Sequence, residues 1–296
     1  MLDYPSLAAV AAVVSEGSFE RAAAALGITP SAVSQRVRGL EERLGTILIV
    51  RGSPCEPTDL GRTLCAHIDQ VRLLEQEIAP KLDRAAEAFR PLTLRIAVNA
   101  DSLATWFPTA VAGFAREAGI ALDLMLEDEA HTADRLRSGE VLAAVTAEPE
   151  AVQGHKITAL GSLRYVACAS PVFVARYFRE GVTGRTLAEV PYLRFDRRDA
   201  LQHRWAREAH GLDLAGPVHW LPSTQAFIDF ALEGLGWSLH PLWLAEPHLA
   251  SGRLVELPPA LRIDVGLHWT VARLHAASLR HLSDAVREGA RRLLVN

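Results

Sequence analysis

The chain has little of several residue types, and each shortage excludes a class of protein. Its 296 residues include three cysteines and two methionines. Cys55, Cys65 and Cys168 show no metal-site spacing, and an odd count without a disulfide framework is typical of a reducing cytoplasm. No run of about 18 apolar residues is free of charge, which argues against a membrane-spanning helix. Asp3 stands where a secretory signal has a basic flank, so we expect a cytoplasmic protein without a signal peptide or membrane contact.

Motifs of common enzymes are also missing. The sequence has no Walker loop, no GxSxG nucleophile elbow and no HExxH zinc motif. Its eleven histidines are scattered without ligand spacing, and the "GLG" at 234–236 is too short for a dinucleotide-binding loop. We therefore expect neither catalysis nor a metal or cofactor. A solute-binding protein is a further alternative, and the missing signal peptide argues against it.

The length favours about two domains. The formal net charge is −4, so binding to nucleic acid has to rest on a local patch rather than on the bulk charge.

The first sixty residues show the pattern of a winged helix-turn-helix. Apolar residues at helical spacing predict a helix over about 5–16, which ends at Gly17. Ser18 caps a second helix that closes at Gly27, and Thr29 caps a third helix with Pro30 at its first position. The stretch 46–64 then predicts two short strands around 52–54, which would form a wing. The alternative is an ordinary helical hairpin with a solvated polar face.

The third helix, within "ITPSAVSQRVRGLEERLG" (28–45), separates apolar from polar residues. Ala32, Val33, Val37, Leu40 and Leu44 form the predicted buried stripe. The polar residues on the other side can hydrogen-bond phosphates and base edges in a major groove. The candidate DNA contacts, wing included, are Thr29, Pro30, Ser31, Ser34, Gln35, Arg36, Arg38, Arg51 and Thr58.

A long helix should follow over about 59–89. Its apolar residues recur in steps of three and four, which favours a narrow seam for a partner helix. The alternative is a helix that lies on its own domain. The candidate dimerisation residues are Leu60, Leu64, Ile68, Val71, Leu74 and Ile78.

From residue 92 onward, short apolar runs alternate with helical stretches, including helices over 102–117 and 130–139. This rhythm predicts a parallel α/β sheet in two subdomains with a cleft between them. Ligands of such sheets bind at the carboxyl ends of strands, beside helix N-termini that favour anions. The candidate effector-binding residues at these ends are Asn99, Asp101, Ser102, Glu127, Asp128, Thr146, Asp196, Ser223 and Thr224.

Each of these residues also has a plain structural explanation. Ser102, Ser223 and Asp101 could be helix caps, and 127–129 could be a solvated acidic run. Trp106 and Trp220 could line the cleft, although core packing is the more common role of tryptophan. Taken together, hydroxyl groups at helix starts and nearby carboxylates suit a small zwitterion with a basic side chain.

The head resembles that of LysR-type transcriptional regulators. The residues that carry this likeness are "FERAAAALGITPSAVSQRVRGLEERLGTILIVR" and "PTDLGRTL", and the resemblance extends over the whole chain, more weakly after about residue 180. "SAVSQR", "AVNADSLATWF" and "RLRSGEVLAAV" are most similar to the ArgP/LysG branch, which regulates export and metabolism of basic amino acids. The resemblance implies a DNA-binding domain over 1–58, a dimerising linker helix over 59–90 and an effector-binding domain over 91–296. It implies subdomain I at about 91–163 and 267–296, and subdomain II at about 164–266.

The resemblance also implies partners and a mechanism. Lysine or arginine would be the effector, and a homodimer or homotetramer would bind a two-fold operator in double-stranded DNA and activate an exporter or metabolic gene. RNA polymerase is a further candidate partner. Two alternatives stay open: a ligand-independent DNA-binding protein of the nucleoid or a replication origin, and a LysR-type regulator that senses a different small anion.

Overall fold

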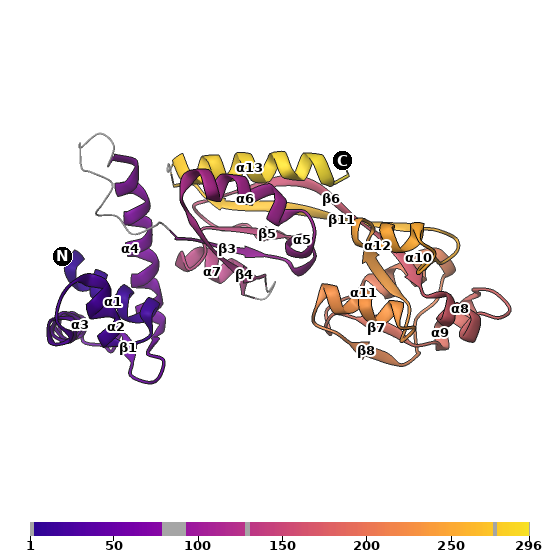
Figure 1. The fold of residues 1–296 in the computed structure, drawn as a ribbon, viewed down its shortest axis with the longest axis horizontal. Coiled ribbons are helices and arrows are strands. Elements are labelled where there is room, and N and C mark those ends of the chain that lie inside the picture. Colours follow the sequence, from indigo (N-terminus) through magenta and orange to yellow (C-terminus); the bar gives the residue numbers. More distant parts are fainter. Residues whose placement is uncertain (1–2, 79–92, 128–130, 275–276, 296) are drawn as a thin grey trace.

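The structure, a computed structural model, describes residues 3–78, 93–127, 131–274 and 277–295. Figure 1 shows three parts in a row: a helical head, the long helix α4 (Asp59–Ile78), and an elongated sensor with two lobes. Within these ranges, no helix is long and apolar enough to cross a membrane. Part of the predicted linker, 79–90, lies outside the described residues, and the predicted domain limits stay predictions.

The head folds as its capping residues predict. α1 (Tyr4–Glu16) ends at Gly17, which has φ 70°, and α2 (Phe19–Leu26) follows Ser18, whose hydroxyl accepts a hydrogen bond from a backbone N–H. α3 (Pro30–Leu44) follows Thr29, whose hydroxyl accepts the N–H of Ala32 at 3.2 Å. The strands β1 (Ile49–Val50) and β2 (Glu56–Pro57) pair antiparallel and form the wing. The core of the head includes Leu7, Val10, Val13, Ala22, Val33, Val37, Leu40 and Leu48.

Helix α4 contacts both of its neighbours within the same chain. Leu64 and Ile68 are buried in the core of the head, so their assignment to a dimer seam is corrected: the chain itself already covers them. Leu73 has no exposed surface and belongs to the core of the sensor. Leu60 and Leu74 are 40% and 41% exposed and remain candidates for a seam. The other two seam candidates are Val71, which is half-buried, and Ile78, whose side chain is not described.

Subdomain I, the lobe next to α4, has a parallel sheet at its centre. β3 (Thr93–Val98) lies between β4 (Ala121–Leu126) and β5 (Ala143–Thr146). The connecting helices are α5 (Ala100–Ala104), α6 (Phe107–Ala118) and α7 (Thr132–Ser138). The C-terminal α13 (Ala277–Leu293) packs beside α6, as Figure 1 shows. The carboxyl ends of β3 and β5 therefore lie together at one edge of this lobe.

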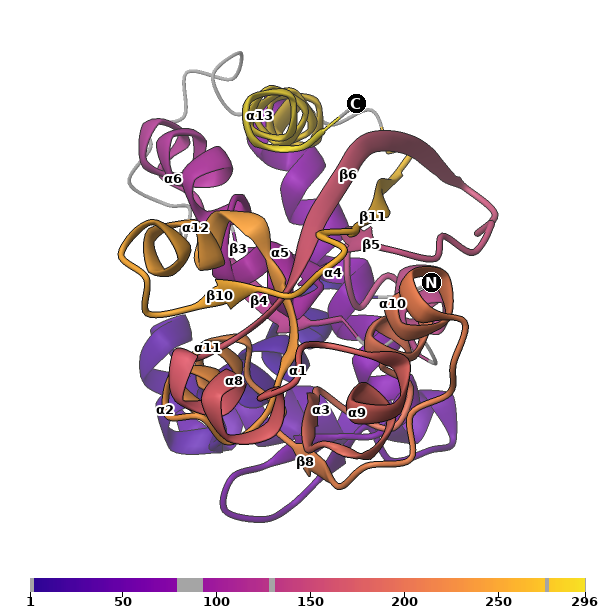
Figure 2. The ribbon, with the colours of Figure 1, turned by 90° about the vertical axis from the view of Figure 1, so that its right-hand side faces the viewer.

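Two long strands connect subdomain I with subdomain II. β6 (His155–Ala169) and β11 (Arg262–Ala272) run antiparallel, with Leu163 opposite Val265. Figure 2, which looks along the long axis of the molecule, shows both strands. Residues 268–271 of β11 pair with β5. Residues 165–169 of β6 pair with β9 (Ser238–Pro241) and β10 (Val255–Glu256). One curled sheet thus runs through both lobes.

Subdomain II surrounds its part of the sheet with short helices. In chain order, its other elements are α8 (Pro171–Tyr177), α9 (Gly184–Glu189), β7 (Tyr192–Arg194), α10 (Leu201–His210), β8 (Val218–Trp220), α11 (Thr224–Leu232) and α12 (Leu242–Ala250). β7 and β8 pair in parallel, so their carboxyl ends lie at the same edge. Trp205 and Trp237, both fully buried, anchor the core of this lobe.

Two details of the sequence prediction are wrong. The sheet is not parallel throughout, because β6, β9, β10 and β11 pair antiparallel with their neighbours. The helix predicted over 102–117 is divided into α5 and α6. Pro108 explains the division: it lies in the first turn of α6, where its missing N–H costs nothing, whereas a continuous helix would place it in the interior.

Candidate DNA-binding and effector sites

The third helix of the head presents polar side chains to solvent. Val33, Val37 and Leu40 are buried, whereas Ala32 is half-buried and Leu44 is 39% exposed, so the buried stripe is narrower than predicted. The opposite side is polar: Ser31, Gln35 and Arg38 are exposed, and Ser34 is half-buried. Such a row suits the floor of a major groove.

Arg36 lies away from that row. It is half-buried and close to Asp3. Hydrogen bonds from Ser6 are the main cause that lowers the pKa of Asp3, and the charges of Arg43 and then Arg36 lower it further. Arg36 therefore occupies the flank of α3 beside the start of α1. A contact with a phosphate at the edge of the groove fits that place better than a contact with a base.

The wing is tied to the helices by hydrogen bonds and by a ring contact. The guanidinium carbon of Arg51 lies 5.1 Å from the centre of the Phe19 ring, which holds this exposed cation at the wing. The carboxylate of Glu41, on α3, accepts the N–H of Leu48 at 2.8 Å. Thr58 donates to the carbonyl of Ile47 at 3.0 Å and accepts from a backbone N–H of α4. Its hydroxyl is used within the head, so Thr58 supports the wing, and its contact with DNA stays a prediction.

In the sensor, polar oxygens are buried where β3 and β5 end. Thr146, the last residue of β5, is 4% exposed, and its hydroxyl has no hydrogen-bond partner among the described residues. Asn99 follows β3, and its N–H donates to the carbonyl of Val145. The Asn99 side-chain oxygen is likewise buried and meets no donor from the parts of the chain that the structure describes. Burying such groups without a partner is costly, so a bound ligand or a buried water has to supply the missing bonds.

Ser102 is fully buried, and its hydroxyl oxygen accepts a hydrogen bond from the Trp106 indole at 3.0 Å. Trp106 itself is 1% exposed and belongs to the core, so it does not line an open cleft. Ser102 can still donate its hydroxyl proton. Its place in the first turn of α5 is close to Asn99 in the chain.

Asp101 connects the two subdomains. One of its carboxylate oxygens accepts the hydroxyl of Tyr165, on β6, at 2.5 Å. The other accepts the hydroxyl of Thr224, the first residue of α11, at 2.8 Å. Burial raises the pKa of Asp101. The two hydrogen bonds lower this pKa and the charge of Asp199 raises it, and the net result is a raised pKa. Burial and their mutual repulsion disfavour the charges of Asp101 and Asp199, and a cation at this junction of α5, β6 and α11 would stabilise both charges.

Two candidates have a local role instead. One oxygen of Asp196 accepts the N–H groups of Arg198 and Asp199 at 2.7 and 2.9 Å, which closes a tight turn after β7. The hydroxyl of Ser223 caps α11 by accepting the N–H of Ala226 at 3.3 Å. Ser223 thus caps a helix and Asp196 closes a turn, and their assignment to the effector site stays a prediction. These bonds use one oxygen of Asp196 and one lone pair of the Ser223 hydroxyl.

Two further candidates are less defined. Glu127 follows β4, and its N–H donates to the carbonyl of Val98 at 2.9 Å, which places it at the same strand-end edge. Asp128 lies outside the described residues.

The sequence prediction missed two groups at the junction. Tyr165 looked like one residue of an apolar strand, and no local signal shows that its hydroxyl reaches Asp101. Asp199 accepts the N–H of Phe195 at 2.9 Å and that of Leu201 at 3.1 Å. Burial raises its pKa as well. Its position within the loop after β7 was a usable signal, because such loops lie at the ligand edge of a sheet.

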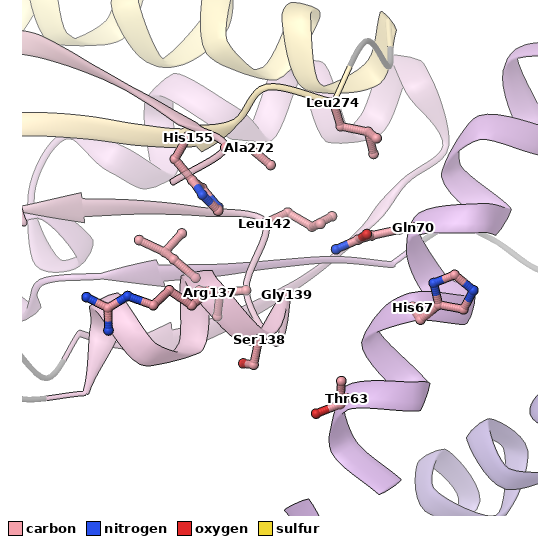
Figure 3. A pocket seen from close by; sticks show the side chains of 13 residues that line it. Thr63, His67, Gln70, Arg137, Ser138, Gly139, Leu142, His155, Ala272 and Leu274 are labelled. Carbon is pink, nitrogen blue, oxygen red and sulfur yellow. The ribbon is translucent and has the colours of Figure 1, made fainter. Parts of the chain in front are cut away.

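A pocket of about 370 Å³ lies elsewhere, between α4 and subdomain I. Figure 3 shows Thr63, His67 and Gln70 on α4, with Gln70 extending toward Leu142 of subdomain I. None of the predicted effector residues line it. A Cβ at Gly139, which ends α7, would lie 2.5 Å from the amide nitrogen at the far end of the Gln70 side chain, so Gln70 reaches this end of α7. The groove therefore marks a contact between the linker helix and the sensor.

A winged helix-turn-helix joined by a long helix to a two-lobed α/β sensor is the architecture of a ligand-responsive DNA-binding regulator. Comparison with known families agrees. The family described as "Bacterial regulatory helix-turn-helix protein, lysR family" matches residues 5–62, and "LysR substrate binding domain" matches residues 90–291. The chain belongs to the LysR family of transcriptional regulators. Members of this family bind DNA, are oligomeric and are not enzymes.

Individual relatives agree with the predicted branch. The chain is 46% identical to the regulator ArgP of Pseudomonas aeruginosa, over 91% of this chain and 89% of that one. It is 40% identical to LysG of Mycobacterium tuberculosis, over 98% and 94%. Among solved structures, ArgP from M. tuberculosis has a TM-score of 0.80 at 38% identity, and LysG from Corynebacterium glutamicum with bound effector Arg has 0.69 at 37%; each comparison covers both chains completely. These comparisons confirm the predicted fold class and the resemblance to the ArgP/LysG branch.

Proposed function

We propose that this LysR-family regulator senses a basic amino acid, lysine or arginine, and controls genes for amino acid export or metabolism. The observation that carries the proposal is the set of buried oxygens where β3 and β5 end. Thr146 can donate its hydroxyl to a carboxylate, and the Asn99 oxygen can accept from an ammonium group. A free amino acid has both groups on one carbon.

The side chain of the effector is a separate part of the proposal. Asp101 and Asp199 are carboxyl groups that interact near the junction of the lobes, and burial raises the pKa of both; a ligand with a cationic end would favour their charged forms. The relative with bound effector Arg, whose sequence is 37% identical, supports the same choice. The two alternatives, a different small anion and no ligand at all, explain these groups less well, because neither matches the acidic junction.

The effector signal can reach the DNA through α4. This helix is packed into the core of the head at Ile68 and into the core of the sensor at Leu73. A change in the sensor that moves α4 would therefore move the recognition helix. In a dimer, such a movement changes the spacing of two heads on a two-fold operator and shifts the population of DNA-binding arrangements. We place this regulator in the cytoplasm, with RNA polymerase as a candidate partner on DNA.

L-arginine or L-lysine at ten times its Kd should stabilise the purified protein by about 1.4 kcal/mol, and an amino acid of neutral side chain should not. Differential scanning fluorimetry against all standard amino acids measures this. Thr146→Val should weaken effector binding by about tenfold or more, since a hydrogen bond to a charged group is lost. The same variant should leave the melting temperature of the free protein unchanged or higher, because its hydroxyl has no partner in the described structure.

These two readouts separate a ligand contact from a structural one. If Thr146→Val lowers the melting temperature and leaves the effector Kd unchanged, Thr146 is not part of the effector site. If no amino acid stabilises the protein of natural sequence, sensing of basic amino acids is wrong, and the DNA-binding head is unaffected by that result.

Leu74→Lys should weaken self-association of the full chain by about tenfold, because it places two charges in an apolar helix seam. Leu74 is exposed within the chain, so the substitution leaves the fold of the protomer unchanged. Analytical ultracentrifugation over a concentration series measures the dimer dissociation constant. Glu75→Lys, one position further along α4, is the matched control. Equal dissociation constants for both variants would show that the seam lies elsewhere.

A further inference from the structure

Two hydroxyl groups from distant parts of the chain hold the carboxylate of Asp101. Tyr165, on β6, donates to one of its oxygens at 2.5 Å, and Thr224, the first residue of α11, donates to the other at 2.8 Å. Both donors are buried, so a hydroxyl that left Asp101 would become an unsatisfied polar group in the interior. The carboxylate is therefore fixed at both of its oxygens.

The fixed carboxylate keeps capacity for a further partner. A carboxylate has about four lone-pair sites, and the two hydroxyls occupy one site on each oxygen. The free site on each oxygen suits the paired N–H groups of a guanidinium or one ammonium group. Asp101 is half-buried, in contrast to its two donors, so part of the residue stays accessible. It lies in the first turn of α5, directly after Asn99, whose buried oxygen has no partner among the described residues.

The two hydroxyls also favour the charged form of Asp101. Burial, the largest effect, raises the pKa of this carboxyl, and the charge of Asp199 raises it too. The hydrogen bonds from Tyr165 and Thr224 lower this pKa, because each donor stabilises the carboxylate. In the described part of the chain, Tyr165 and Asp199 are the titratable groups that act on Asp101. Burial raises the pKa of Tyr165 as well, so its hydroxyl keeps the proton that it donates.

We propose that Tyr165 and Thr224 are positioning residues of the effector site, which orient the Asp101 carboxylate for the cationic end of a basic amino acid. The inference rests on the proposed function and assigns recognition of the basic side chain to Asp101. Because Thr224 belongs to subdomain II and Asp101 to subdomain I, this arrangement exists only while the lobes are together. A basic effector would therefore favour it over an arrangement in which the two residues are apart.

Isothermal titration calorimetry of the full chain with L-arginine and with L-lysine, from about pH 5 to about pH 8, tests the proposal. Tyr165→Phe should weaken binding of both by about three- to tenfold at the upper end of this range. The loss should be larger at the lower end, because the variant raises the pKa of Asp101 and a protonated carboxyl attracts no cation. Thr224→Val should act in the same way, whereas Thr224→Ser keeps the hydroxyl and should bind like the natural protein.

A double-mutant cycle shows whether the hydroxyls act through Asp101. Asp101→Asn should weaken arginine binding by about tenfold or more and flatten its pH dependence, since position 101 then carries no charge at any pH. In that background, Tyr165→Phe should have no further effect on the Kd. If Tyr165→Phe weakens binding equally with Asp101 and with asparagine in its place, the positioning role is wrong.

Tyr177→Phe is the matched control. Tyr177 packs on Phe173 with ring centres 4.6 Å apart, and Figure 1 shows α8 at the outer end of subdomain II, away from α5. This variant should change neither the Kd nor its pH dependence.

The remaining outcomes separate this inference from the proposed function. If arginine binds the natural protein and Tyr165→Phe keeps the same Kd and pH profile, the positioning role is wrong while the proposed function stands. If Tyr165→Phe does not fold, the Thr224 variants decide the question: equal Kd values for Thr224→Val and Thr224→Ser overturn the proposal. If the natural protein binds no basic amino acid, both proposals fail.

Discussion

Replacing Gly289 with alanine should destabilise the sensor by about 3 kcal/mol, because two helices touch at this residue. A Cβ at position 289 would lie 2.2 Å from the Cβ of Ala110 and 2.9 Å from its Cα. Neither atom is the end of a flexible side chain, so α13 and α6 have to move apart. Their separation would open the packing of Val286 and Ala290, which are buried on the same helix.

Tryptophan fluorescence during urea denaturation measures this effect on the sensor alone, because all tryptophans of the chain lie at residue 106 or beyond. The double substitution of Gly289→Ala with Ala110→Gly should recover most of the loss, since it exchanges the two residues across the contact. Gly113→Ala is the matched control: a Cβ there meets nothing within 4 Å, and α6 should gain up to about 1 kcal/mol from the better helix former. Equal stabilities of the Gly289 and Gly113 variants would contradict the close contact.

Local signals in the sequence predicted the head well. Ser18, Thr29 and Gly27 determine where helices begin and end through bonds that span three or four residues, and such bonds depend little on the rest of the fold. The apolar pattern of α4 was also visible. Its periodicity could not show which partner covers each residue, and the structure assigns Ile68 to the head and Leu73 to the sensor.

The effector site could be predicted only in part, because its contacts join distant residues. The rule for strand ends led to Asn99 and Thr146, and the structure places Asn99 beside the end of β5, where its N–H donates to the carbonyl of Val145. It also named Asp101 and Thr224, but it could not show that they bond to each other, since 123 residues separate them. Tyr165 was missed because the crossing of β6 between the lobes brings it to Asp101, and that crossing depends on the whole sheet.

Asp196 and Ser223 show why polar residues at strand ends are ambiguous. A carboxylate or hydroxyl near a strand end can bind a ligand or satisfy the backbone beside it, and the sequence is the same in both cases. The structure shows the difference through partners: Asp196 and Ser223 already accept backbone N–H groups, whereas the Thr146 hydroxyl is buried without a partner in the described chain. A buried hydroxyl without a partner at a strand end is therefore a stronger candidate than one that already satisfies the backbone.

Gln35→Ala should have the largest effect on DNA. Gln35 is exposed on α3, and a glutamine amide in a major groove can make two hydrogen bonds to an adenine. Such a pair discriminates by about 1–3 kcal/mol, and a dimer that presents two recognition helices loses it twice. We therefore expect operator affinity to fall by about 2–6 kcal/mol. Alanine is a good helix former, so α3 keeps its shape.

Fluorescence anisotropy on an operator selected from random duplexes by the natural protein, and on unrelated DNA, measures this prediction. Binding of the Gln35 variant to unrelated DNA should not change, since phosphate contacts supply that affinity. Arg36→Ala is the contrasting variant: loss of a phosphate contact should weaken both DNAs alike and reduce the salt dependence. If Gln35→Ala weakens both DNAs equally, Gln35 does not read a base. If the natural protein selects no sequence at all, the result favours a ligand-independent architectural role over regulation at a two-fold operator.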